Sequence, residues 1–354
     1  MFCTIILTAC AVEESQKIKV GVISPLTGDF ASYGSDVQRG IALALEENDF
    51  KDVKVIYEDA CLPKEASTAI NKLVQVDNVD LISGVFCIIS VEPILALADQ
   101  DDINVMMVAS VPDAFVGISE DLFSAHFAIK DEAIAQAEFA YNYLGARKGA
   151  ILFLDNPFGI SYKNNFAKRF EELGGNIVST EALDVYKGDF RTPITKVKTA
   201  SPDVVLVVHL GNELGLILKQ AKELGVDAKF IGTYEAEDIS VINAGGAATE
   251  GLWISSPKML EQGKVSDFTK RFNQKYGAAP TAISRNAYDA VKLQINAYKQ
   301  CAGDKKCIRT TIGSTKNYDG ASGKFSISAN GTAVKEIIFK QVQNGTFQLI
   351  DSVN

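Results

Sequence analysis

The stretch that decides the fold is Lys17–Asn48, KIKVGVISPLTGDFASYGSDVQRGIALALEEN. It opens with a short run of β-forming residues, Ile18–Ile23, which predicts a strand. After a loop, apolar residues recur on one helical face over Asp36–Glu47, and this spacing predicts a helix. A strand followed by a helix begins a βαβ series, from which parallel sheets are built.

Outward from this stretch, strand and helix alternate through the chain twice. In the first series, strands are expected over Val53–Asp59, Asp80–Phe86 and Ile103–Ala109, and helices over Glu65–Val76 and Val91–Gln100. In the second series, strands are expected over Ala150–Leu154, Asn176–Leu183, Asp203–Leu210, Lys229–Thr233 and Leu252–Ser255, and helices over Glu132–Leu144, Tyr162–Leu173, Thr192–Thr199 and Glu213–Leu224. Helices Val265–Tyr276 and Arg285–Lys299 follow, and Asn344-Gly345 predicts a hairpin in the tail. Two series of similar size predict an α/β fold with two similar lobes.

Length and charge agree with such a fold and exclude some partners. The chain has 354 residues, too many for one ordinary core and enough for two lobes. Hydrophobic residues make up 47%, and the formal net charge is -9. An acidic chain is a poor binder of nucleic acid or of anionic lipid headgroups through a basic surface.

The motifs of common enzymes are missing from the sequence. GxGxxG, GxxxxGK[ST] and GxSxG do not occur, which argues against dinucleotide, P-loop and α/β-hydrolase chemistry. The two histidines, His126 and His209, lie far apart, and there is no HExxH or CxxC pattern. We therefore expect neither an enzyme, nor a metal site, nor a cofactor.

The N-terminus suggests export. It reads MFCTIILTAC over residues Met1–Cys10, too short to span a bilayer. Leu7-Thr8-Ala9-Cys10 resembles a lipobox, in which Cys10 would carry the lipid, with residues 1–16 as signal remnant and tether. The alternative is a frayed apolar end with a chance cysteine. The lipobox reading predicts a lipoprotein anchored at the cell surface or in the periplasm.

Four cysteines remain outside this segment. Pairing Cys61 with Cys87, and Cys301 with Cys307, would use every one of them. An even cysteine count together with an export signal favours an oxidising compartment. The alternative is four buried free thiols.

Several segments in the same order resemble one known family. Besides the opening stretch they are Tyr57–Lys64 (YEDACLPK), Ser83–Pro93 (SGVFCIISVEP), Asp189–Val205 (DFRTPITKVKTASPDVV) and Ala287–Val291 (AYDAV). Together they resemble type I periplasmic solute-binding proteins, in the branched-chain amino-acid (Leu/Ile/Val) branch of ABC transporters. The resemblance covers roughly residues 17–350 and independently implies a bridge between Cys61 and Cys87.

The resemblance implies two Rossmann-like lobes joined by a hinge of three crossovers. The crossovers are expected near His126–Asp131, Ser255–Lys258 and Asn330–Val334. Lobe 1 is then 17–127 plus 258–331, and lobe 2 is 128–257 plus 332–354. The ligand is expected in the cleft at the C-terminal ends of the strands, where hinge closure would trap it.

The implied site combines main-chain donors, aromatic walls and one acid. N–H groups of Cys87, Ile88 and Ile89, at a helix start, would hold a carboxylate. Glu235, or else Glu237, would neutralise an ammonium, and the Ser110 hydroxyl would bond either group. The full set of expected ligand-binding residues is Tyr33, Phe86, Cys87, Ile88, Val108, Ala109, Ser110, Phe158, Leu210, Tyr234 and Glu235.

The chain departs from the branch at some of these positions. Ile88 stands where a serine is usual, and tyrosines are usual near Phe158 and Leu210. The ligand is therefore expected to be more apolar or aromatic than usual, or to have its carboxylate held by Arg191 or Arg285. The expected function is the substrate-binding component of an ABC importer: a monomer that captures an amino acid or a similar carboxylate or amide and works with a membrane permease. The alternatives are a ligand sensor for an amide, urea or aromatic acid, and, less favoured, a secreted enzyme.

Overall fold

The computed structural model describes residues 17–47, 50–184, 188–259 and 262–350. The lipobox expected at Cys10 and the tether therefore lie outside the described residues. None of the helices in the described part of the chain combines the length and the apolar character needed to span a bilayer.

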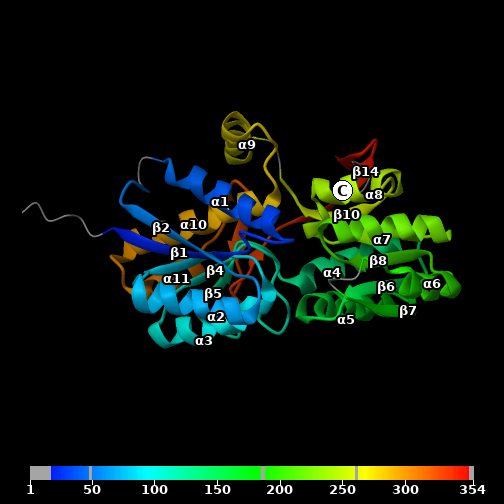
Figure 1. The fold of residues 1–354 in the computed structure, drawn as a ribbon, viewed down its shortest axis with the longest axis horizontal. Helices are drawn as coiled ribbons and strands as arrows, with labels where there is room; N and C mark the ends of the chain where they lie inside the picture. The colour runs from blue at the N-terminus through cyan, green and yellow to red at the C-terminus, as the bar shows by residue number, and fades with distance from the viewer. Residues whose placement is uncertain (1–16, 48–49, 185–187, 260–261, 351–354) are drawn as a thin grey trace, which may run out of the picture.

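Lobe 1 is built on a five-stranded sheet in the order β2-β1-β3-β4-β5 (Figure 1). All of its strand pairs are parallel. Helices α1 and α10 lie on one face, and α2 and α3 on the other. Its strands are β1 (Ile18–Ser24), β2 (Val53–Asp59), β3 (Leu81–Val85), β4 (Val105–Met107) and β5 (Leu122–Ser124). Its helices are α1 (Ala31–Leu45), α2 (Pro63–Asn71), α3 (Val91–Ala98), α9 (Gly263–Tyr276), α10 (Ala282–Cys301) and α11 (Lys305–Gly313).

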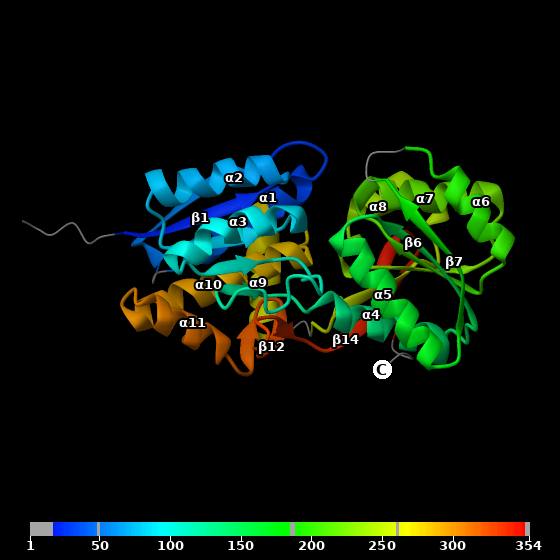
Figure 2. The same cartoon turned by 90° about the horizontal axis from the view of Figure 1, so that it is seen from below.

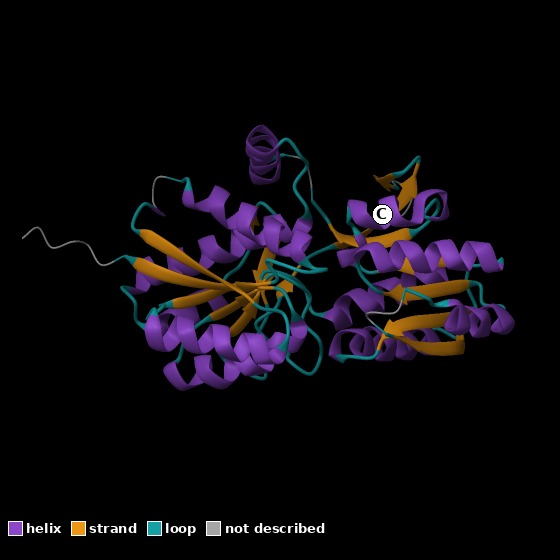
Figure 3. Ribbon diagram, in the orientation of Figure 1, coloured by secondary structure: helices purple, strands orange, loops and turns teal. Residues whose placement is uncertain are grey.

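Lobe 2 is built on a seven-stranded sheet in the order β15-β14-β10-β9-β8-β6-β7. Strands β6 to β10 are parallel, and β14 and β15 run antiparallel at one edge. Figure 3 shows each sheet flanked by helices. The strands are β6 (Lys148–Leu154), β7 (Asn176–Leu183), β8 (Val204–Val208), β9 (Lys229–Gly232), β10 (Trp253–Pro257), β14 (Ile337–Gln343) and β15 (Thr346–Leu349). The helices are α4 (Ile129–Glu138), α5 (Pro157–Glu172), α6 (Arg191–Ala200), α7 (Gly211–Leu224) and α8 (Ile239–Gly245).

The two sheets repeat one topology, which confirms the expected pair of similar α/β lobes. In lobe 1 the strand order is β2-β1-β3-β4-β5, and in lobe 2 the corresponding order is β7-β6-β8-β9-β10. In each sheet the second and third strands along the chain lie on opposite sides of the first: β2 and β3 flank β1, and β7 and β8 flank β6. The loops at the C-terminal ends of these strands form a crevice, where open α/β sheets bind ligands.

The chain passes between the lobes after β5, after β10 and after β13 (Ala333–Val334), as Figure 2 shows for the last passage into β14. These segments lie side by side: the Ala333 N–H donates to the His126 carbonyl (3.0 Å), and the Lys258 N–H to the Glu336 carbonyl (2.7 Å). Strand β13 pairs with β12 (Gly323–Ile327), which also pairs with β11 (Tyr318–Gly320). The third passage thus follows Val334, beside the expected segment.

Candidate functional site

A cavity of about 620 Å³ lies between the lobes. Residues at or after the ends of β1, β2, β3 and β4 line it from lobe 1, and residues at or after the ends of β6, β8 and β9 line it from lobe 2. Its lining residues are Pro25, Thr27, Gly28, Asp29, Phe30, Asp59, Cys61, Leu62, Glu65, Phe86, Cys87, Ile88, Ile89, Ala109, Leu154, Asn156, Phe158, Leu210 and Glu235. The cavity therefore occupies the crevice that the repeated topology creates.

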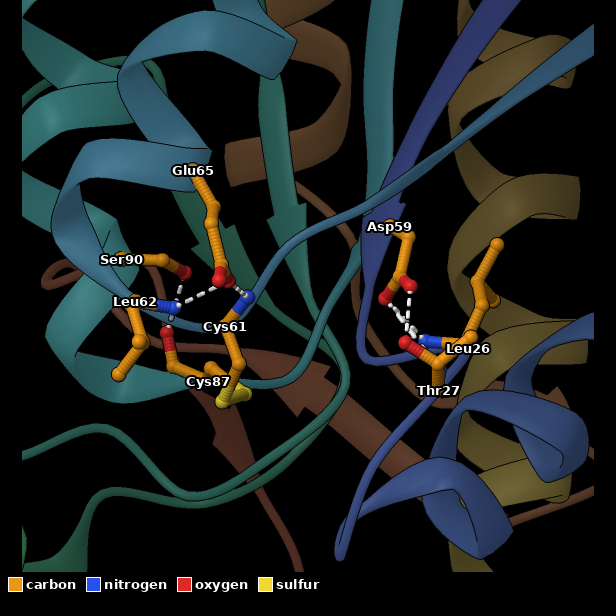
Figure 4. The surroundings of a disulfide bond; sticks show 8 residues. All are labelled: Leu26, Thr27, Asp59, Cys61, Leu62, Glu65, Cys87 and Ser90. Atoms are coloured by element: carbon orange, nitrogen blue, oxygen red, sulfur yellow. Dashed lines mark hydrogen bonds between the residues drawn. A yellow bond between two sulfur atoms is a disulfide. The ribbon is translucent and has the colours of Figure 1, made fainter.

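Asp59, the last residue of β2, fixes the loop that follows β1. Its carboxylate accepts hydrogen bonds from the Leu26 N–H (2.7 Å) and from the N–H and hydroxyl of Thr27 (Figure 4). Partial burial acts to raise the pKa of Asp59, but these hydrogen bonds hold it below its ordinary value. Asp59 is thus an anion that holds one wall of the cavity in place.

A disulfide joins the ends of β2 and β3 at the cavity. Cys61 and Cys87 are bonded, with their Cα atoms 5.2 Å apart (Figure 4), and Cys301 is bonded to Cys307. This is the pairing expected from the sequence. Glu65 accepts hydrogen bonds from the N–H groups of Cys61 (3.2 Å) and Leu62 (3.1 Å), which caps the start of α2.

The chain after Cys87 begins a helix that points its N-terminus at the site. A 3-10 turn, Ile88–Ser90, leads directly into α3, and the Ser90 hydroxyl donates to the Cys87 carbonyl. The first N–H groups of a helix have no carbonyl partner within it, and they lie at the positive end of the helix dipole. Ile88 and Ile89, both lining the cavity, carry these groups.

Apolar side chains from both lobes form the walls. Phe86 lines the cavity from lobe 1, and its ring stacks on Tyr33 with centroids 4.6 Å apart. Phe158, in the first turn of α5, lines it from lobe 2 together with Leu210. These walls suit an apolar ligand group.

Glu235 is the acid that lines the cavity from lobe 2, and it is nearly fully buried. Its Oε1 accepts a hydrogen bond from the Ser110 hydroxyl (2.7 Å), and its Oε2 lies 3.4 Å from the Tyr162 hydroxyl. Burial raises the pKa of Glu235, while the hydrogen bond from Ser110 acts to lower it. Glu237, the other acid considered from the sequence, accepts hydrogen bonds from Ser256 and Lys340 and does not line this cavity.

The charged residues among the lining set are all acidic: Asp29, Asp59, Glu65 and Glu235. Arg191 and Arg285, considered as carboxylate partners, are elsewhere. Arg191 is exposed and pairs with Asp189 and Glu223. Arg285 is buried, and it donates to the carbonyls of Val265 in α9 and of Ala321, which directly follows β11.

The structure brings most of the expected ligand-binding residues to one place. Those that line the cavity are Phe86, Cys87, Ile88, Ala109, Phe158, Leu210 and Glu235. Four others, Tyr33, Val108, Ser110 and Tyr234, lie behind the lining. The hydroxyl of Ser110 contacts Glu235 and His126, and the Val108 carbonyl accepts a hydrogen bond from Asn286 (3.0 Å).

Sequence reasoning missed part of the lining. Phe30, Asp59 and Asn156 were not singled out, although each lies at or just after the end of an expected strand or in the loop after one. Asn156 also caps α5, because its side chain accepts a hydrogen bond from the Gly159 N–H (3.0 Å). Since ligands of open α/β sheets bind at strand ends, position alone could have identified these residues. Within the described residues, no cluster of His, Cys, Asp or Glu is arranged to hold a metal ion.

Two α/β lobes of matching topology that enclose a small cavity between facing strand ends define a two-lobed solute-binding protein. Residues 17–346 match the periplasmic binding protein family, and the chain belongs to that family, as a type I member of its branched-chain amino-acid branch. The Leucine-, isoleucine-, valine-, threonine-, and alanine-binding protein of Pseudomonas aeruginosa is 28% identical over 255 residues, 69% of this chain and 68% of that protein. The Leu/Ile/Val-binding protein homolog 2 of Brucella abortus is 26% identical and covers 93% of this chain and 91% of its own length.

Solved structures agree in fold. A leucine-binding protein from Thermotoga maritima superposes with a TM-score of 0.90 at 25% identity, over 94% of this chain and 97% of that one. A solute-binding protein of an ABC transporter from Rhodopseudomonas palustris, in complex with benzoate, superposes with a TM-score of 0.86 at 20% identity, over 94% of this chain and 95% of that one.

Proposed function

We propose that the protein captures a free amino acid with an apolar side chain in the cavity between its lobes, as the extracytoplasmic substrate-binding component of an ABC importer. The observation that carries this proposal is that Glu235 and a helix N-terminus border the same cavity, whose described lining residues include no lysine, arginine or histidine. The family of the chain and the names of its relatives support it.

The geometry suits the three parts of such a ligand. Its carboxylate would bind the N–H groups of Ile88 and Ile89 at the start of the helix that leads into α3. Its ammonium would pair with Glu235, which is buried and in contact with the cavity. Its side chain would pack on the wall formed by Phe86 and Phe158. Because the ligand's carboxylate and ammonium would each have a partner of their own, the fit of the ligand's side chain would determine specificity.

The same charges disfavour a simple aromatic acid. Benzoate, bound by one structural neighbour, carries one negative charge and no ammonium. In this cavity it would leave Glu235 without a cation, and its carboxylate would find neutral donors but no lysine, arginine or histidine among the described lining residues. A buried carboxylate without a partner cation costs free energy, so a zwitterion should bind more tightly than an aromatic acid of similar size.

Calorimetric titration tests the proposal with leucine, phenylalanine, benzoate and an amide. The amino acids should bind and benzoate should not compete with them. Glu235→Gln should weaken amino-acid binding roughly tenfold to a hundredfold, because it removes a charge-assisted hydrogen bond. Glu237→Gln is the matched control, since Glu237 contacts Ser256 and Lys340 instead of the cavity. Tighter binding of benzoate than of either amino acid would contradict the proposal.

The location and partners follow from the same proposal. The family and the disulfides support a place outside the cytoplasm, where thiols oxidise. We propose further that Cys10 carries a lipid and that a monomer delivers its ligand to a membrane permease. The mass of the mature N-terminal peptide checks the first point, because a lipid adds acyl mass to Cys10.

A further inference from the structure

Two carboxyl groups are buried side by side behind the cavity. Glu235 lines the cavity, and Glu132, in the first turn of α4, has no exposed surface. The Tyr162 hydroxyl lies between them: it contacts Oε2 of Glu132, and it lies 3.4 Å from Oε2 of Glu235. Among the described residues, no lysine or arginine forms an ion pair with either carboxyl.

The hydrogen bonds at Glu132 divide its two oxygens into different roles. Oε1 accepts from the Tyr234 N–H (2.7 Å), from the Ser255 hydroxyl and from the Gln136 amide (3.2 Å). Three donors leave no room for a proton on this oxygen. Oε2 has the Tyr162 hydroxyl as its partner, and that hydroxyl carries a single proton. Tyr162 therefore cannot donate to Glu132 and Glu235 at once.

A second chain of donors reaches Glu235 from lobe 1. The Ser110 hydroxyl lies 2.7 Å from Oε1 of Glu235 and 3.2 Å from Nδ1 of His126. Burial lowers the pKa of His126 well below its ordinary value, so the ring is neutral. Nε2 of His126 is buried and has no hydrogen-bond partner among the described residues, so the tautomer with its proton on Nδ1 leaves no buried N–H of the ring unpaired there. His126 then donates to Ser110, and Ser110 donates to Glu235.

We propose that Glu132 is protonated and donates a hydrogen bond to the Tyr162 hydroxyl. Tyr162 and Ser110 then both donate hydrogen bonds to ionised Glu235, and the two acids together present one negative charge to the cavity. Glu132 is then a positioning residue that acts through Tyr162. The consequence for specificity rests on the proposed function: one buried anion matches a ligand with one ammonium, and a zwitterion is preferred over a dication. The alternative, two buried anions sharing one hydroxyl proton, carries an uncompensated repulsion.

The surroundings of the pair support this placement of the proton. Burial, followed by the charge of Glu235, raises the pKa of Glu132 to about 8. The other titratable side chains packed around the pair are Tyr33, Tyr162, Tyr234 and His126, and burial favours the neutral form of each. The shared proton therefore belongs to the carboxyl groups.

Infrared spectroscopy of the ligand-free protein at neutral pH locates the proton. The difference spectrum between wild type and Glu132→Gln should contain the C=O stretch of a neutral carboxyl group. The difference spectrum between wild type and Glu235→Gln should contain carboxylate bands. Other buried acids cancel in both differences. Carboxylate bands in the Glu132 difference would overturn the proposal.

Tyr162→Phe tests the link between the two acids. It removes a donor to ionised Glu235, so the pH at which amino-acid affinity is half lost should rise, and affinity at neutral pH should fall by roughly tenfold. Tyr141→Phe is the matched control, because its ring packs against Arg147 and Phe170 away from the cavity. If folded Tyr162→Phe loses half of its amino-acid affinity at the same pH as wild type, the proposed hydrogen bond from Tyr162 to Glu235 is rejected.

The two proposals fail separately. If wild type binds no amino acid, the proposed function is wrong, while the infrared measurement on the ligand-free protein still decides where the proton lies. If amino acids bind and Glu132→Gln weakens them as much as Glu235→Gln, both carboxyls act as anions and the single-charge pair is rejected.

Discussion

Glu132 is a carboxyl group with no exposed surface, and its titration should be visible in the stability of the protein. Its pKa is raised in the folded state from 4.5 to about 8, chiefly by burial. A group of this kind binds more protons in the folded state, so the stability it contributes is lost as pH rises from the unfolded to the folded pKa. The melting temperature of Glu132→Gln, compared with that of wild type, should therefore increase as the pH rises from the unfolded to the folded pKa of Glu132. Parallel pH profiles for the two proteins would contradict this.

Glu235 should make ligand affinity depend on pH, with weaker binding at lower pH. An ammonium binds the ionised carboxylate, and burial raises the pKa of Glu235. Lowering the pH through that raised pKa should therefore weaken amino-acid binding, because a proton must leave before the ammonium can bind. Calorimetry over a pH series measures the effect, and Glu235→Gln should flatten the profile. A wild-type affinity that is constant down to mildly acidic pH would count against Glu235 as the partner.

The role of these acids could not be predicted from sequence. Asp131 and Glu132 look like solvated residues at a helix start, and nothing in the pattern marks Glu132 as buried. Ser110 was expected to contact the ligand, yet its hydroxyl contacts Glu235, a residue 125 positions away in the chain. Interactions across two lobes depend on how the lobes meet, and local periodicity carries no information about that.

Among the elements, the Cys61–Cys87 bridge joins the ends of two strands at the cavity, and its loss should affect both stability and binding. The bridge closes 26 residues, for which the chain-entropy estimate is about 3.5 kcal/mol. The double variant Cys61→Ser, Cys87→Ser should melt at lower temperature and bind ligand more weakly, because Cys61 and Cys87 both line the cavity.

The second bridge provides the control. Cys301–Cys307 spans 6 residues between α10 and α11, and the same estimate gives about 2 kcal/mol. Removing it should lower the melting temperature less and leave ligand affinity as in wild type. Equal losses of affinity in the two double variants would show that the bridge at the cavity has no specific effect on the site.

Long periodic elements were predictable, and short ones were not. The helix expected over Arg285–Lys299 is α10, and the hairpin expected at Asn344-Gly345 joins β14 to β15, with both turn residues at positive φ. Strand β5 was missed because a strand of three residues, Leu122–Ser124, is too short to show a period. Helix α8 was missed because it is short and ends in glycine.

At the scale of the whole molecule, the two lobes are in direct contact with each other through hydrogen bonds. Asn165 of lobe 2 donates to Asp113 of lobe 1 (2.6 Å), in addition to the contact between Ser110 and Glu235. Small-angle X-ray scattering should show a smaller radius of gyration with saturating amino acid than without it, because hinge closure brings the lobes together. Glu235→Gln at the same ligand concentration should show less of this change. Identical radii with and without ligand would argue against closure.

Both lobes are assembled from segments distant in the chain. Helix α10, which packs on α1 at the heart of lobe 1, and strand β14, which pairs with β10 in lobe 2, belong to the last quarter of the sequence. During synthesis, then, β1 to β5 emerge well before α10, and β10 lacks its antiparallel partner until β14 has emerged. Each lobe therefore needs a segment from late in the chain to complete its packing, so we expect the two lobes to reach their final form together, late in folding.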